Sequence, residues 1–232
     1  YADARNVSVG ASRIEFDWRD EHVQVPLGGR FNVMNALAAL TAASALGVDA
    51  ATAAAGVAGA APVPGRFEVV SDPRLHPFTV VVDYAHTPDG LVEVLTAARS
   101  VADGGRVIAV FGCGGDRDTD KRPMMGDAAA QHADLVVVTS DNPRHEDPEA
   151  IIAAAVAGIE ASYREDVRVI VDRRTAIESV IREAQPGDVI VIAGKGHETT
   201  QTIGDTAFPF DDRQVARSAL ADVTGLETDD RA

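Results

Sequence analysis

The residues best suited to chemistry lie in one short loop, Ser140 to Glu146, which reads Ser-Asp-Asn-Pro-Arg-His-Glu. It follows an apolar, β-branched run, Leu135–Val138, which predicts a buried strand. It precedes Asp147-Pro148-Glu149, which predicts the N-cap and acidic first turn of a helix. In an open parallel sheet, ligands bind outside the carboxyl ends of the strands, so this loop is expected to bind a small ligand.

Charged side chains in this loop and its neighbours are complementary to an amino acid. Arg117 and Arg144 each offer a planar guanidinium that can bind a carboxylate with two hydrogen bonds. Asp141 and Glu198 can hold an ammonium group, and Asn142 can donate and accept hydrogen bonds at once. We therefore expect the site to bind a small zwitterionic substrate.

Similar polar loops follow other expected strands. Because the carboxyl ends of parallel strands meet at one sheet edge, these loops are expected to open together, and loops positioned in this way commonly carry function. With the Ser140–Glu146 loop, they are Asp83-Tyr84-Ala85-His86-Thr87-Pro88, Gly112-Cys113-Gly114-Gly115-Asp116-Arg117-Asp118 and Gly194-Lys195-Gly196-His197-Glu198.

The glycine-rich loop at Gly112 does not match a nucleotide-binding signature. A dinucleotide fingerprint needs Gly-x-Gly-x-x-Gly, but Arg117 occupies the position of the third glycine. The P-loop pattern Gly-x-x-x-x-Gly-Lys-Ser/Thr is absent, because Gly194-Lys195-Gly196 lacks both its spacing and its hydroxyl. Any ATP chemistry would therefore need a phosphate-binding loop from elsewhere.

Two histidines and the cysteine in these loops do not form a recognisable catalytic or metal motif. His86 and His197 lack the spacing of a zinc-binding helix and are expected to line the site as polar groups. Cys113 directly follows a strand and has no evident base partner, so it is expected to pack as a small buried thiol. We predict no metal site in this chain.

Composition excludes several classes of function. The 232 residues carry 36 acidic and 21 basic side chains, for a formal net charge of −15, which argues against nonspecific binding to nucleic acid or to an anionic membrane. No apolar run approaches the ~18 residues of a membrane span. The single cysteine permits no intrachain disulfide and favours a cytoplasmic setting.

The elements that position these loops are visible in the pattern of the chain. Alternation from Ala11 to Val25 predicts a hairpin, and two alanine-rich helices are expected over Asn32–Leu46 and Asp49–Ala60. Pro62-Val63-Pro64-Gly65 then predicts a linker, which we take as the domain boundary. From Arg66 onward strands and helices alternate, which predicts an α/β fold with a Rossmann-like, mostly parallel sheet between helices. The expected strands are 67–70, 79–83, 106–111, 135–139, 167–171 and 189–192, with helices from about Pro88, Pro123, Pro148, Arg173 and Asp212 and a hairpin over 200–210.

Several motifs, in order, resemble the Mur ligases and their folylpolyglutamate synthase relatives. Gly29 to Ala39, Gly65-Arg66-Phe67-Glu68 and Asp83 to Pro88 carry the general resemblance. The Gly112–Asp118 loop with Lys121-Arg122-Pro123, together with Asp141-Asn142-Pro143-Arg144 and the Gly194–Glu198 loop, resembles the members that add meso-diaminopimelate. The resemblance runs nearly from end to end.

This resemblance implies an ATP-dependent ligase of peptidoglycan synthesis. Such an enzyme joins an amino acid to UDP-N-acetylmuramoyl-L-alanyl-D-glutamate through an acyl-phosphate, with Mg²⁺. It implies that residues 1–64 are the C-terminal part of a P-loop ATPase domain and residues 65–232 a complete amino-acid-binding domain. In the full enzyme the second domain would swing onto the first about Pro62–Gly65.

The family's functional residues can be carried over position by position. Asn35 would contact adenine, Arg66 a phosphate or the ribose, and Asp83 the ribose, with His86 in the same ATP-binding set. The set expected to bind meso-diaminopimelate is Arg117, Asp141, Asn142, Pro143, Arg144, Gly194 and Glu198. Ser140 departs from relatives that have an acidic residue there, which leaves its role open.

The expected selectivity has a physical basis. Diaminopimelate differs from lysine by a distal carboxylate, for which the Arg144 guanidinium is a suitable partner. Lysine would leave that arginine unpaired in a desolvated site, at a cost of about 1 to 3 kcal/mol or more.

The resemblance also implies that parts of the enzyme would precede Tyr1. These are the uridine-nucleotide domain, the P-loop, the magnesium-binding residues and the carbamoylated lysine. We therefore expect no catalytic residue in this chain and no ligation by the chain alone. Two alternatives remain at this point: a non-catalytic amino-acid-binding module, and a folylpolyglutamate synthase relative.

Overall fold

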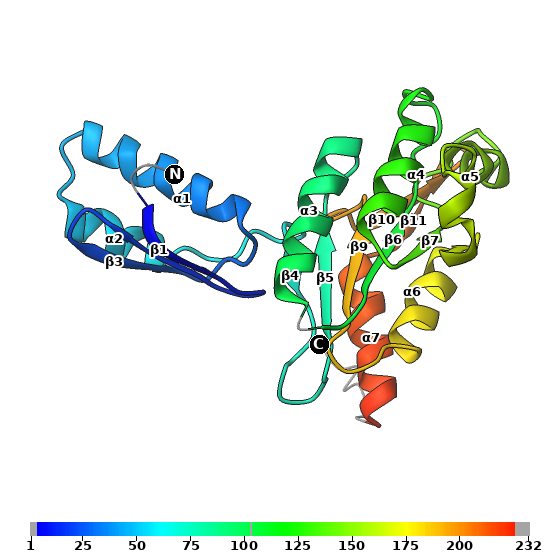
Figure 1. The fold of residues 1–232 in the computed structure, drawn as a ribbon. Coiled ribbons are helices and arrows are strands. Elements are labelled where there is room, and N and C mark those ends of the chain that lie inside the picture. The colour runs from blue at the N-terminus through cyan, green and yellow to red at the C-terminus, as the bar shows by residue number, and fades with distance from the viewer. Residues whose placement is uncertain (1–3, 103, 226–232) are drawn as a thin grey trace.

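The computed structural model describes residues 4–102 and 104–225. Its N-terminal unit is an antiparallel sheet of β1 (Ala4–Val9), β2 (Ile14–Trp18) and β3 (Glu21–Val25), in that order. Alternate residues of β2, among them Phe16, are buried against α1 (Phe31–Ala45) and α2 (Ala50–Ala58), as the alternation predicted. Figure 1 shows this unit on one side of the molecule, joined to the larger unit by the segment around Pro62–Gly65.

The larger unit is built on a 6-stranded sheet in the order β4-β5-β9-β6-β7-β8. Only the edge strand β4 (Glu68–Val69) runs antiparallel to its neighbour among these strands. The other strands are β5 (Thr79–Asp83), β6 (Val107–Phe111), β7 (Leu135–Val138), β8 (Val167–Val169) and β9 (Val189–Ala193). The predicted α/β class, with its mostly parallel sheet, is confirmed.

Helices cover both faces of this sheet. Helices α3 (Pro88–Val101), α4 (Lys121–His132) and α5 (Pro148–Ala157) pack on the face that carries Val81, Phe111 and Val191. On the opposite face, α6 (Arg173–Arg182) and α7 (Asp212–Thr224) pack against Val82, Val110 and Ile192. Strands buried on both faces require continuous apolar runs, which explains why β5, β6, β7 and β9 lack alternation.

Side-chain caps determine where several helices begin. Asp147 accepts a hydrogen bond from the backbone N–H of Glu149 at the start of α5, and Thr87 and Asp49 cap α3 and α2 in the same way. Helix α4 begins at Lys121, two positions before the predicted Pro123. Proline is tolerated there because the first N–H groups of a helix have no intrahelical partner.

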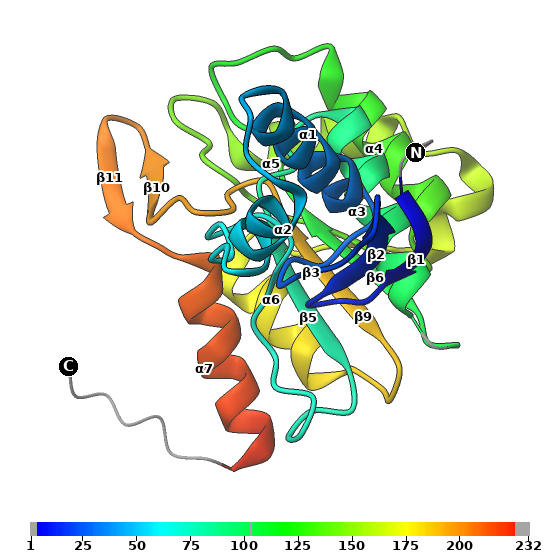
Figure 2. The same ribbon diagram turned by 90° about the vertical axis from the view of Figure 1, so that its left-hand side faces the viewer.

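Two short elements complete the fold. Strands β10 (Thr200–Ile203) and β11 (Thr206–Pro209) form the predicted hairpin around Gly204, which Figure 2 shows extending from the body of the domain. A 3₁₀ helix, η1 (Ala161–Asp166), was not predicted; it lies between α5 and β8. Over the described ranges, no helix is both long and apolar enough to span a lipid bilayer.

Candidate functional site

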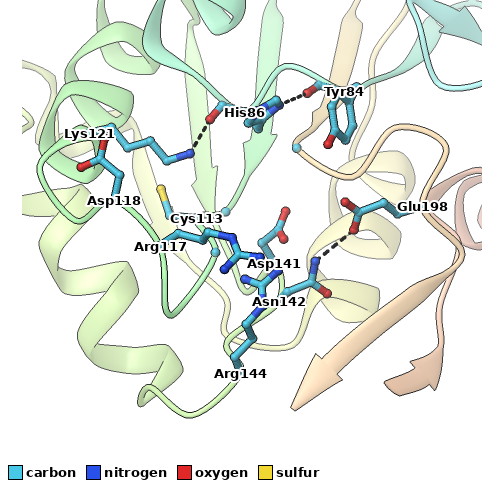
Figure 3. Close-up of a pocket in the computed structure, with 13 residues that line it drawn as sticks. Tyr84, His86, Cys113, Arg117, Asp118, Lys121, Asp141, Asn142, Arg144 and Glu198 are labelled. Carbon is cyan, nitrogen blue, oxygen red and sulfur yellow. Dashed lines mark hydrogen bonds between the residues drawn. The ribbon is translucent and has the colours of Figure 1, made fainter. Parts of the chain in front are cut away.

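The polar loops after β5, β6, β7 and β9 surround one cavity at the carboxyl edge of the sheet (Figure 3). Its volume is about 350 Å³. The expected convergence of these loops is therefore found in the structure. The lining residues are Tyr84, His86, Gly112, Cys113, Gly114, Arg117, Asp118, Lys121, Asp141, Asn142, Arg144, Gly194 and Glu198.

Glycines in the loop after β6 allow it to lie directly against the loop after β7. A Cβ atom on Gly115 would lie 1.9 Å from the carbonyl oxygen of Pro143, and one on Gly112 would lie 2.4 Å from that of Thr139. The backbone N–H of Gly115 donates to the carbonyl of Asn142 at 2.9 Å. These glycines thus serve close backbone packing, which explains a glycine-rich loop without a dinucleotide fingerprint.

Two arginines, Arg117 and Arg144, lie beside Gly114 and supply positive charge to the cavity. Arg144 has φ of 50°, and its Nη1 donates to the carbonyl of Gly115 at 2.7 Å. Arg117 Nη1 donates to the carbonyl of Asp116 at 3.0 Å. Each guanidinium has further N–H groups for a ligand carboxylate. Lys121, on the same wall, donates to the carbonyl of His86 at 2.8 Å.

The carboxylates that line the cavity are those of Asp118, Asp141 and Glu198. Asp141 is buried, and burial raises the pKa of its carboxyl while the charges of Arg173 and Lys195 oppose this shift. Gly194, at φ of 114°, leaves room for it, because a Cβ atom there would lie 2.7 Å from Asp141 Oδ2. Arginines and carboxylates that line the same cavity offer partners for both charges of a zwitterion.

Asn142 lines the cavity, but much of its hydrogen-bonding capacity is used by the protein. Its Oδ1 accepts from Lys195 Nζ at 3.1 Å and from the backbone N–H of Thr202 at 2.9 Å. Its Nδ2 donates to Glu198 Oε2 at 3.0 Å. Lys195 was not singled out from the sequence, although it is fully buried beneath these residues.

A second unpredicted group is the buried ion pair of Arg173 and Asp212, whose side chains have 0% exposure. Arg173 Nη2 donates to Asp212 Oδ2 at 2.7 Å and to the carbonyl of Ala193 at 3.0 Å, and Nη1 donates to the carbonyl of Ser140 at 3.3 Å. The pair therefore joins the starts of α6 and α7 to two loops of the site. No sequence signal marked it, because Arg173 and Asp212 begin ordinary polar helices.

The four residues expected to bind ATP line a second cavity of about 460 Å³, to which both units contribute residues. Asn35 lines it from α1 and Arg66 from the segment after the linker. The oxygens of Asp83 accept backbone N–H groups from Phe67 at 2.7 Å and Ala85 at 2.8 Å, so Asp83 also shapes this wall. His86 completes the set, and its Nδ1 lies 2.9 Å from the carbonyl oxygen of Tyr84.

Tyr84 and His86 line both cavities and so form a shared wall. The Tyr84 ring lies 4.6 Å from that of His86 and 5.2 Å from that of His197, centroid to centroid. The guanidinium carbon of Arg66 lies 4.7 Å from the same ring. A ligand in either cavity would contact this aromatic cluster.

Three other residues discussed from the sequence lie away from ligand contact or are unreactive. His197, expected to line the site, is exposed and lines neither cavity. Pro143, placed in the substrate set, is buried and does not line the cavity; its carbonyl packs against Gly115. Cys113 lines the cavity but is 6% exposed, and burial raises the pKa of its thiol to about 11. A thiol that remains protonated is a poor nucleophile.

Within residues 4–102 and 104–225, no group of three or more His, Cys, Asp or Glu side chains is arranged to hold a metal ion. The residues present therefore do not form a complete site for Mg²⁺.

Comparison with known proteins gives consistent matches. The family described as "Mur ligase, glutamate ligase domain" matches residues 65–196. UDP-N-acetylmuramoyl-L-alanyl-D-glutamate–2,6-diaminopimelate ligases from Synechocystis sp. and Gloeobacter violaceus are 52% and 54% identical, each over 84% of this chain. A solved structure of a ligase of that name aligns with 94% of this chain and 45% of its own, with a TM-score of 0.69 and 42% identity. The chain covers 38% and 39% of the two sequence relatives, so it spans about two-fifths of their length.

Proposed function

This chain belongs to the Mur ligase family, and we propose that it forms the C-terminal portion of a ligase that adds meso-2,6-diaminopimelate to UDP-N-acetylmuramoyl-L-alanyl-D-glutamate. The observation that carries this proposal is the cavity at the carboxyl edge of the sheet, which is lined by both arginines and carboxylates. The relatives of that activity, at 52% and 54% identity, support it.

In this proposal the cavity binds the incoming amino acid. Arg144 and Arg117 bind carboxylates, and the distal carboxylate of diaminopimelate is the partner of Arg144. Asp141 and Glu198 accept hydrogen bonds from an ammonium group, and Asn142 Nδ2, which has a second hydrogen, donates to the ligand. Gly194 contributes by leaving space for Asp141. Pro143 acts indirectly, by holding its neighbours in place.

ATP is proposed to bind in the second cavity. Its lining suits the nucleoside part, because an amide from Asn35 can contact adenine, the carboxylate of Asp83 can accept from a ribose hydroxyl, and Arg66 can bind a phosphate or the ribose. The sequence has no P-loop to bind the remaining phosphates. ATP bound there would supply the phosphoryl group of the reaction, and this chain's residues would hold and orient the nucleoside.

We propose the domain boundary at Pro62–Gly65, with residues 1–64 belonging to the ATPase domain and residues 65–232 forming the amino-acid-binding domain. Between Phe31 and Gly65 the only charged residue is Asp49, in a chain that is 25% charged. On α1 and just after it, Met34 is 44% exposed and Leu46 86% exposed. An uncharged helical surface of this kind supports packing against further polypeptide of the same enzyme.

The proposal also places the reaction in the cytoplasm and makes UDP-N-acetylmuramoyl dipeptide, diaminopimelate and ATP the small-molecule partners. The single, buried cysteine suits a reducing compartment.

A chimera tests the proposal. The matching 195-residue segment of the Synechocystis relative would be replaced by this chain, and product formation followed by mass spectrometry with diaminopimelate or lysine. We expect ATP-dependent ligation of diaminopimelate in preference to lysine. The native Synechocystis ligase is the positive control. A folded chimera that binds ATP but ligates neither amino acid would contradict the proposal.

Calorimetry of the 232-residue chain separates the proposal from a free-standing, non-catalytic module. Weak binding of diaminopimelate, strengthened in the chimera, is expected of a site completed by another domain. Tight binding by the chain together with an inactive chimera would favour the module.

A further inference from the structure

Lys195 is the buried cation at the base of the amino-acid cavity. Its side chain is fully buried, and its Nζ donates to Asn142 Oδ1 at 3.1 Å, to Glu198 Oε2 at 3.2 Å and to the carbonyl of Thr200 at 2.6 Å. An ammonium group has three N–H donors, so these three acceptors use all of them. Lys195 is therefore unable to bind a ligand directly, but it contacts two residues that line the cavity.

The contact with Lys195 determines which way the Asn142 amide points. Lys195 Nζ and the backbone N–H of Thr202 both donate, so the Asn142 atom facing them must be the oxygen. Nδ2 is then directed toward Glu198 Oε2, as Figure 3 shows. The second Nδ2 hydrogen remains available to an acceptor on the ligand. With Oδ1 facing Lys195, Asn142 therefore acts as a donor in the cavity.

The same lysine also orients Glu198. Asn142 Nδ2 and Lys195 Nζ both donate to Oε2. Two donors on one oxygen hold the carboxylate in a single rotamer and leave Oε1 to accept from an ammonium group. Through these contacts Lys195 leaves Asn142 as a hydrogen-bond donor and Glu198 as an acceptor in the cavity.

The positive charge of Lys195 also compensates the negative charges of Asp141 and Glu198, which burial would otherwise destabilise. Asp141 and Glu198 both line the cavity, and Asp141 is buried. Removal of the lysine charge would leave two carboxylates with less compensation in a desolvated site. The orientation of Glu198 and the ionisation of Asp141 therefore both depend on it.

We propose that Lys195 is a positioning residue that sets the affinity for the amino acid. It holds Asn142 Oδ1 toward its own Nζ, so that Nδ2 faces the cavity, and it directs Glu198 Oε1 at the ligand. This rests on the proposed function, because it takes an amino acid as the ligand of this cavity. Lys195 contacts no substrate and is not a catalytic residue.

The test is an NMR titration of the 232-residue chain with meso-diaminopimelate and, separately, with ATP. Lys195→Met keeps the length of the side chain and removes the charge and all three donors. We expect it to raise the Kd for diaminopimelate at least about tenfold, which corresponds to the loss of hydrogen bonds between charged groups. The Kd for ATP should remain within about twofold of the wild-type value, because the nucleotide cavity does not include Lys195.

A double-mutant cycle separates positioning from general damage. In an Asn142→Ala background, Lys195→Met should weaken diaminopimelate binding by much less than it does alone, because part of its effect acts through Asn142. Independent, multiplying effects would overturn the proposal, as would a Lys195→Met variant that binds diaminopimelate like the wild type. Arg168→Met is the control, because it removes a cation from an exposed pair with Glu183.

Two further measurements cover the remaining outcomes. If Lys195→Met fails to fold, Lys195→Gln, which keeps one N–H donor group, must show the same selective loss of diaminopimelate affinity. If the wild-type chain alone binds diaminopimelate too weakly to measure, the chimera tests the proposed function, and the side-chain amide resonances of Asn142 in the chain test the positioning role directly. These resonances should shift when Lys195 is replaced and should not shift in Arg168→Met. If they do not shift in the Lys195 variants, the proposal is overturned.

Discussion

Gly65 in the linker lies against Gly196 in the loop after β9, so closely that a Cβ atom on Gly65 would come within 2.1 Å of the Gly196 carbonyl carbon. Both residues have positive φ, 65° and 52°. The linker that we propose as a hinge therefore contacts the loop that carries Lys195 and Glu198.

This contact predicts a marked effect of a single methyl group. Gly65→Ala should lower the free energy of unfolding by about 1–3 kcal/mol, because alanine disfavours positive φ and its Cβ atom would overlap the Gly196 backbone. Urea unfolding of the chain measures the change. Gly56→Ala is the matched control: it lies within α2 with open space around it and should be neutral or stabilising, by up to about 1 kcal/mol. Equal stability of the two variants would contradict the close contact.

Arg144 is expected to determine the preference for diaminopimelate. In the active chimera, Arg144→Ala should reduce the preference for diaminopimelate over lysine at least about tenfold, because only diaminopimelate has a carboxylate for this guanidinium. The ratio of kcat/KM for the two amino acids measures it. Arg168→Ala, which alters an exposed pair on the outer strand β8, should keep the ratio. If the ratio of kcat/KM values is the same in Arg144→Ala as in the parent chimera, residues other than Arg144 determine the selectivity.

The buried pair of Arg173 and Asp212 predicts a strongly non-additive result. Arg173→Met alone leaves Asp212 charged and unpaired in the core and should cost about 3–5 kcal/mol of unfolding free energy. Arg173→Met with Asp212→Leu removes both charges and should recover a large part of that loss. Denaturant unfolding is measured for the wild type, Arg173→Met, Asp212→Leu and the double variant. Additive costs in the double variant would mean that the pair is not coupled as the structure shows.

His145 predicts a pH dependence of the β10–β11 hairpin. Its Nδ1 lies 2.8 Å from Asp116 Oδ2 and its Nε2 lies 3.0 Å from Asp205 Oδ1, so it links the glycine-rich loop to the tip of the hairpin. Hydrogen bonds to these two carboxylates raise the pKa of His145 above its ordinary value of 6.5. A raised pKa means that the contact is fully stabilising below pH 6.5 and is lost as the pH rises through the folded-state value.

Hydrogen exchange of the hairpin amides, corrected for intrinsic rates, measures this effect. Protection should fall as the pH rises above 6.5, and His145→Gln should remove the dependence. His132→Gln is the control, because His132 contacts the carbonyl of Ala128 within α4 and is remote from the hairpin. A pH dependence that persists in His145→Gln would assign it to another group.

The order of elements and the grouping of the polar loops were predictable because they depend on local patterns. Apolar runs such as Leu135–Val138 mark strands covered on both faces, and Asp147 followed by Pro148 marks a helix start. Once the sheet is parallel, its geometry places the loops at one edge. The nearness of Arg117, Arg144, Asp141 and Glu198 therefore follows from the sequence, and their shared cavity agrees with it.

What only the tertiary structure decided is which of these polar groups remain available to a ligand. Asn142 is partly used by Lys195 and Thr202, and Pro143 is turned away against Gly115. The burial of a charge depends on partners that are distant in sequence, as Arg173 and Asp212 illustrate, and no local pattern encodes such pairings. The chain's residue types thus predict a site suited to a zwitterion, while the fold determines which atoms face the cavity.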